Sequence, residues 1–150
     1  MLRSALRLLP LVVVAFALPS SSALAQSLQE LAGRWALDRA SSSFGPGDPG
    51  ADRVEIAFSP TEVTVRRVFN PGSPTGSVWT LPLDGSAPPS AKRGSAVVVD
   101  GNKLVITHVR AQQVVTHVYT VAGDALTVDR SIQSADGTNL KHTMVFKRVS

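Results

Sequence analysis

Most of the chain beyond residue 30 alternates apolar and polar residues, and this period of two constrains the fold more than any other feature. Successive side chains of an extended strand point to opposite faces, so the alternation predicts strands with one buried face. Valine and threonine dominate these segments, as is typical of strands. Apart from a short turn at 28–31, we predict no helix. We expect nine strands, at residues 31–38, 53–59, 62–69, 77–83, 94–100, 103–110, 114–121, 125–133 and 139–148.

Residues that favour tight turns separate most of these strands, and they predict an antiparallel up-and-down order. The turn sequences are Pro60-Thr61, Asp100-Gly101-Asn102, Gly123-Asp124 and Asp136-Gly137. Closing such a meander into a barrel of about eight or nine strands would remove its edges. A sandwich is the alternative, but it needs longer crossing connections, which only the loops at 41–52 and 84–93 could supply.

The first 25 residues have the three-part pattern of a signal peptide. Arg3 and Arg7 precede an apolar run over 8–18, and Ala23-Leu24-Ala25 has the small residues that a signal peptidase accepts. The alternative is an uncleaved membrane anchor. The apolar run argues against it, because it is shorter than the roughly 20 residues of a spanning helix. We expect cleavage after Ala25, a periplasmic or secreted location, no membrane span after cleavage, and one all-β domain over 26–150.

Composition and motifs exclude several classes of function. The chain has no cysteine, which excludes a disulfide scaffold, thiol catalysis and a lipoprotein anchor. The predicted leader holds two of the 15 basic residues, so the remainder is close to charge balance and no nucleic-acid partner is indicated. The sequence has no nucleophile-elbow serine, phosphate-binding loop or pair of inward carboxylates, so we predict no enzyme and no cofactor.

Hairpin turns set the register of the later strands, because a slip of one residue would reverse which face is buried. The turns that keep apolar residues facing apolar ones are 101–102, 112–113, 123–124 and 135–137. The second turn would place His117 opposite His108, and the fourth would place His142 opposite Arg130. All four side chains would then lie at one level on the inward face, where a protein core usually has apolar side chains.

Three interpretations of this polar level stay open. Arg130 beside the histidines favours a carboxylate, phosphate or sulfate ligand. His108 and His117, if directly opposed, could share a metal, although we predict no metal site. Side chains bonded to one another and to water would instead form a structural layer. The residues predicted to line a ligand site are Trp35 at the floor, Arg67, Trp79, His108, His117, Tyr119, Arg130 and His142.

Motifs near both ends resemble those of known barrels. Gly33-Arg34-Trp35 has the G-x-W form found at the start of lipocalins, and Arg148 is placed like the lipocalin arginine that lies across that tryptophan. The wider pattern, which includes Asn102-Lys103-Leu104-Val105-Ile106, resembles a group of exported, lipocalin-like bacterial proteins of unknown function. The resemblance implies a lipocalin-like antiparallel barrel and export, and it implies no established activity.

The sequence therefore predicts an exported, lipocalin-like barrel that binds a small anionic or amphipathic molecule in its interior. The alternative is a structural or protein-interaction domain of the cell envelope with a filled barrel. It would use the loops at 41–52 and 84–93 to contact an unknown protein partner.

Overall fold

A computed structural model describes residues 28–46, 51–69, 76–84 and 94–150, and the predicted leader lies outside these ranges. The described residues form nine strands, with short helical turns at 28–31 and Arg39–Ser41. All nine predicted strands are confirmed, each to within two residues at either end. They are β1 (Gly33–Leu37), β2 (Arg53–Phe58), β3 (Glu62–Val68), β4 (Gly76–Pro82), β5 (Gly94–Asp100), β6 (Lys103–Arg110), β7 (Gln113–Ala122), β8 (Ala125–Ser134) and β9 (Asn139–Val149).

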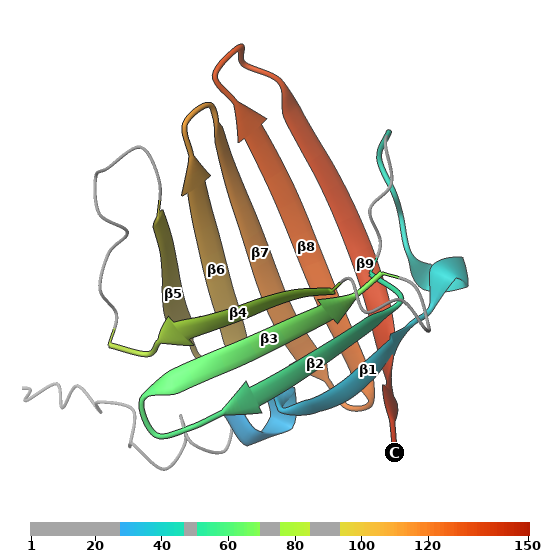
Figure 1. The fold of residues 1–150 in the computed structure, drawn as a ribbon. Coiled ribbons are helices and arrows are strands. Elements are labelled where there is room, and N and C mark those ends of the chain that lie inside the picture. Colours follow the sequence, from blue (N-terminus) through green and yellow to red (C-terminus); the bar gives the residue numbers. More distant parts are fainter. Residues whose placement is uncertain (1–27, 47–50, 70–75, 85–93) are drawn as a thin grey trace, which may run out of the picture.

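The strands form one antiparallel sheet in the order β4-β3-β2-β1-β9-β8-β7-β6-β5. The sheet curls so that β2, β3 and β4 cross in front of β5 to β8 (Figure 1). Pairing of β1 with β9 joins the two ends of the described chain. The all-β, antiparallel up-and-down barrel predicted from the sequence is therefore confirmed, and the structure shows it nearly closed.

Closure is incomplete between β4 and β5, which are the two ends of the strand order. We call this opening the seam. The prediction that closure would remove every edge was wrong here. Tight turns join the pairs from β5 to β9, whereas β4 and β5 are joined by the longer stretch 83–93, so no hairpin turn imposes pairing between them.

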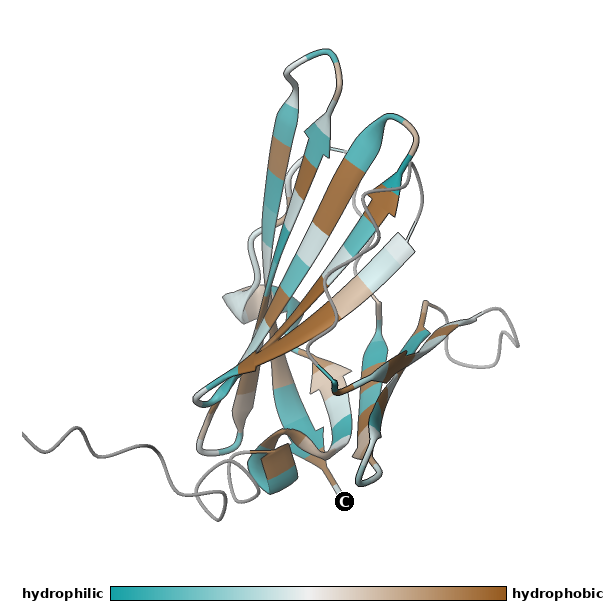
Figure 2. Cartoon of the chain, turned by 90° about the vertical axis from the view of Figure 1, so that its left-hand side faces the viewer, coloured by the Kyte–Doolittle hydropathy of each residue, from teal (hydrophilic) through white to brown (hydrophobic). Residues whose placement is uncertain are grey.

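The core lies between the inward faces of the curled sheet. Hydrophobic and hydrophilic residues alternate along the strands (Figure 2), as the period of two predicts. The largest fully buried side chains include Trp35, Tyr119, Phe146, Leu31 and Leu104. Leu31 comes from the helical turn at 28–31, which therefore adds its side chain to the core at the barrel end that also holds Trp35.

Gly33, Trp35 and Arg148 close this end of the barrel. The Arg148 guanidinium carbon lies 4.1 Å from the centroid of the Trp35 ring. Its Nη1 donates to the Ala32 carbonyl at 2.9 Å and its Nη2 to the Glu30 carbonyl at 2.6 Å. A Cβ on Gly33 would lie 2.7 Å from Arg148 Nη1, and the φ of 136° also favours glycine. The contact implied by the lipocalin resemblance is thus present, and it explains the glycine of G-x-W.

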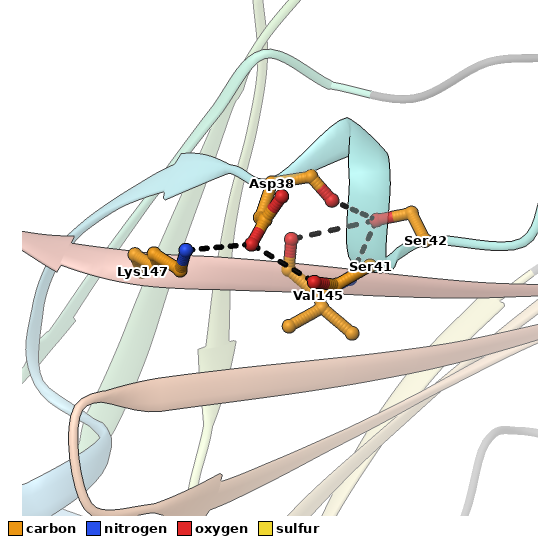
Figure 3. Close-up of polar contacts among 5 residues, drawn as sticks. All are labelled: Asp38, Ser41, Ser42, Val145 and Lys147. Atoms are coloured by element: carbon orange, nitrogen blue, oxygen red, sulfur yellow. Dashed lines mark hydrogen bonds and ion pairs between the residues drawn. The ribbon is translucent and has the colours of Figure 1, made fainter.

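The helical turn Arg39–Ser41 and its flanking residues are fastened to β9 (Figure 3). Lys147 Nζ lies 2.8 Å from Asp38 Oδ2, which also accepts from the Ser41 hydroxyl at 3.0 Å. The Ser42 hydroxyl donates to the Asp38 carbonyl at 2.7 Å and accepts from the Val145 amide at 2.9 Å. These contacts hold the chain that leaves β1 against the last strand.

Three of the four predicted hairpin registers are confirmed, and the β6–β7 register is corrected. Its turn lies at 111–112 rather than 112–113, so His117 pairs with Ile106 and His108 pairs with Val115. The shift is two residues, which leaves the inward faces unchanged. Because every side chain keeps its face in both registers, alternation could not distinguish them.

Candidate functional site

Six of the eight predicted ligand-lining residues lie together on the inward side of β3, β4, β6, β7 and β8. Arg130 pairs with His117 across β8 and β7, as predicted, whereas His108 lies two residues farther along its strand than predicted. We call this group the His–Arg cluster; it consists of Arg67, Trp79, His108, His117, Tyr119 and Arg130.

Aromatic contacts join the cluster across the seam. The Trp79 ring on β4 lies 4.3 Å from the His108 ring and 5.2 Å from the His117 ring, measured between centroids. His117 is stacked on Tyr119 at 6.2 Å, and the Arg67 guanidinium carbon is 5.5 Å from the Trp79 ring centroid. Side chains therefore connect the edge strand β4 with β6 and β7 on the far side of the seam.

Several buried polar atoms of the cluster have no hydrogen-bond partner within the described part of the chain. They are both ring nitrogens of His117, Nε2 of His108, the Tyr119 hydroxyl, and Nε and Nη1 of Arg130. Buried polar groups in folded proteins are bonded in about 90% of cases or more. A concentration of such atoms at one level marks a place that suits a polar ligand or ordered water.

The charge of the cluster is positive. Burial lowers the pKa of Arg67, and the neighbouring Arg130 lowers it further, while Tyr119 opposes the shift. Burial, with Arg67 and Arg130 nearby, also lowers the pKa of His117 to about 2. Burial raises the pKa of Tyr119. No carboxylate is buried among the residues that the structure describes. A neutral histidine and a neutral tyrosine thus lie beside two guanidinium groups, which is an environment that favours an anion.

The other two predicted residues, Trp35 and His142, have structural contacts of their own. The Trp35 indole nitrogen donates to the Leu31 carbonyl at 3.1 Å, beneath the Arg148 guanidinium. His142 pairs with Arg130 across β8 and β9, but its Nδ1 accepts from the Gly45 amide at 3.0 Å. These bonds tie Trp35 to the barrel end and His142 to the segment that follows β1.

Two residues near the cluster were not predicted. The Ser95 hydroxyl lies 2.7 Å from His108 Nδ1, and Ser95 pairs directly with His108 across β5 and β6. Arg110 lies two residues after His108 on β6 and therefore on the same, inward face of the strand. Burial is the main cause that lowers the pKa values of His108 and Arg130, and the charge of Arg110 lowers both further. The 101–102 turn sets a register between β5 and β6 in which Ser95 pairs with His108. Extending that register along the two strands would have identified Ser95 from the sequence.

No three histidine, cysteine, aspartate or glutamate side chains are grouped as metal ligands in the ranges that the structure covers. His108 and His117 are 5.8 Å apart between ring centroids and are not directly opposed. The described chain also has no helix of the length and hydrophobicity needed to span a membrane.

No family model matches the sequence, and no curated protein matches it. Solved structures do match. The fluorescent protein UnaG aligns with 19% identity and a TM-score of 0.58, over 81% of this chain and 99% of that one. The Schistosoma mansoni fatty-acid-binding protein in complex with arachidonic acid aligns with 17% identity and a TM-score of 0.57, over 83% and 99%.

Zebrafish ileal bile acid-binding protein complexed with cholic acid aligns with 15% identity and a TM-score of 0.54, over 80% of this chain and 99% of that one. Likeness at this level of identity concerns the fold. The chain has the nearly closed, antiparallel architecture of the lipocalin-like, or calycin, barrels.

Proposed function

We propose that this protein binds one small amphipathic carboxylic acid inside its barrel, with the acid group on the His–Arg cluster. The observation that carries the proposal is the concentration of buried, unpartnered donors beside two guanidinium groups, with no buried carboxylate among the described residues. An anion would satisfy the donors and the charge together.

The geometry of the donors suits a carboxylate. Nε and Nη1 of Arg130 are both unpartnered, and a guanidinium can bind the two oxygens of a carboxylate side by side. The Tyr119 hydroxyl and the His117 ring add further donors at the same level. Apolar inward side chains such as Ile106 and Val128 would contact the apolar part of the ligand.

The structural neighbours are consistent with this ligand class. Arachidonic acid and cholic acid, present in two of the similar structures, both combine a carboxyl group with a large apolar body. Barrels of this size hold one such molecule when their side chains leave room for it.

The test is binding of a dansyl-labelled undecanoic acid, compared with its uncharged methyl ester. We expect the acid to bind and Arg130→Met to weaken its affinity about tenfold or more, because a charged hydrogen bond contributes about 1.5–3 kcal/mol. The affinity for the methyl ester should change little in Arg130→Met. Arg53→Met, which changes an exposed arginine on β2, is the matched control and should leave both affinities unchanged.

Equal affinity for acid and ester, or no effect of Arg130→Met, would reject the proposal. That outcome would favour the alternative function, a filled barrel that acts through its surface. Complete burial of Trp35, Tyr119 and Phe146 is the observation in favour of a filled interior.

We also propose that the chain is exported after cleavage behind Ala25, on the strength of the three-part leader described above. The intact mass of the protein recovered from its own cells tests this, since the mature chain would begin at Gln26. A mass that includes residues 1–25 would contradict it.

A further inference from the structure

A pocket of about 400 Å³ opens at the seam, where β4 lies near the start of β5 and the end of β6. Its volume is in the range of small-molecule sites. We call it the seam pocket; its lining residues are Trp79, Gly94, Ser95, His108, Val109 and Arg110. Two of these, Trp79 and His108, also belong to the His–Arg cluster and therefore form the wall between the pocket and the barrel interior.

His108 is held in this wall by one ring nitrogen. Its Nδ1 lies 2.7 Å from the Ser95 hydroxyl, and 8% of the residue is exposed. When the hydroxyl donates to Nδ1, the ring carries its proton on Nε2, which is buried and has no partner among the described residues. His108 then has an unpartnered hydrogen-bond donor within the wall.

Arg110 places positive charge at the rim. It is exposed, and no carboxylate forms an ion pair with it in the described ranges. Its charge reaches two cluster residues, since it contributes to lowering the pKa of His108 and of Arg130. Positive charge is thus present both at the rim, on Arg110, and inside the barrel, on Arg67 and Arg130.

A mainly apolar pocket of about 420 Å³ lies farther along β5. Its lining residues are Leu28, Pro60, Leu83, Asp84 and the run Val97–Val99, so one carboxylate lies among apolar side chains. Ser95 and Val97 are two residues apart, about 7 Å along a strand. The seam therefore offers basic groups at one position and apolar groups at the next, which suits an amphipathic molecule better than an inorganic anion.

We propose that the seam pocket is an outer subsite for a carboxylic acid, which Arg110 and His108 hold before it passes Trp79 to reach the interior. The inference rests on the proposed function, since it concerns the same ligand class and adds the place where that ligand first binds. Trp79 is the side chain that must move, because it contacts His108 and His117 across the seam.

The experiment follows the association of the dansyl-labelled undecanoic acid by stopped-flow fluorescence. We expect Arg110→Gln to lower the association rate constant at least about threefold at low ionic strength, and the loss to shrink in high salt, where charges are screened. The methyl ester should associate equally with both proteins. Arg53→Gln is the control for the loss of one exposed positive charge, and it should have a much smaller effect.

A second variant tests the wall without altering charge. Trp79→Phe should raise the association and dissociation rate constants together, with a smaller change in the dissociation constant. Unchanged rates in Trp79→Phe, or equal effects of Arg110→Gln and Arg53→Gln, would overturn the seam pocket as an outer subsite. If wild type binds the acid and Arg130→Met weakens it, these results would reject the subsite alone; no binding by wild type would reject the proposed function itself.

Discussion

His117 on β7 is the cluster residue whose protonation responds most to its surroundings. Only 2% of it is exposed, and burial next to Arg67 and Arg130 lowers its pKa to about 2. The folded protein therefore holds the ring neutral at mildly acidic pH, whereas the unfolded chain protonates it below about pH 6.5. This difference links the stability of the barrel to pH.

Because the unfolded state binds the proton more readily, the stability that neutral His117 allows is present above about pH 6.5 and is lost as pH falls. Between pH 7 and pH 5 we expect His117 to remove about 2 kcal/mol from the free energy of unfolding. Urea unfolding at both pH values checks this, and His117→Gln should show a smaller loss over the same interval. An identical loss in the variant would contradict this, because it would mean that His117 binds its proton equally well in the folded and the unfolded protein.

Single residues of the site differed in how well the sequence could identify them. Arg67, His117 and Arg130 could be predicted because each is a polar residue at an inward position of an otherwise apolar face. The bonds of Trp35 to Leu31 and of His142 to Gly45 could not be, because Leu31 and Gly45 approach from segments outside the strands. Such contacts depend on how the barrel ends are covered, which alternation along a strand does not describe.

At the scale of elements, turns determined what could be predicted. The turn that contains Gly123, with its φ of 60°, fixes the β7–β8 register that the sequence indicates. The β6–β7 turn over Ala111 and Gln112 lacks such a residue, so its position could be placed one residue too late. A one-residue error in the turn becomes a two-residue shift in pairing, which moves His108 away from His117.

The fastening of the Arg39–Ser41 turn to β9 should contribute measurably to stability. Ser42→Ala removes the hydroxyl that accepts from the Val145 amide, and we expect it to cost about 1–2 kcal/mol of unfolding free energy. Ser41→Ala is the matched control: Ser41 is exposed and its hydroxyl bonds only the Asp38 side chain, so the cost should be below about 0.5 kcal/mol. Chemical unfolding measures both, and equal costs would show that the contact with β9 adds nothing.

At the scale of the whole molecule, the strands beside the seam differ from the inner strands in how many neighbouring strands pair with them. β7 and β8 are paired on both sides, whereas β4 and β5 are each paired on one side only. The sequence did not reveal this difference, because β4 and β5 carry the same strand alternation as the rest. The long connection between them gave the only sign that they need not pair.

Amide hydrogen exchange should reveal the seam directly. We expect amides of β7 and β8 to exchange at least about tenfold more slowly than those of β4 and β5, because edge strands open with less free energy than strands inside a sheet. Exchange measured on the isolated protein tests this strand by strand. Uniform protection across all nine strands would indicate that the barrel opens only as a whole.

Pairing of β1 with β9 sets the order in which the barrel can be assembled. Trp35 lies opposite Arg148, so the two partners are separated by almost the entire described chain. Contacts between such distant segments require a large loss of chain entropy before they form, and they slow folding. Hairpins such as β7–β8 can form early from local sequence, but the end beneath Arg148 stays open until β9 is present. A chain that is made or transported from its N-terminus is therefore committed to the closed barrel only when its last strand arrives.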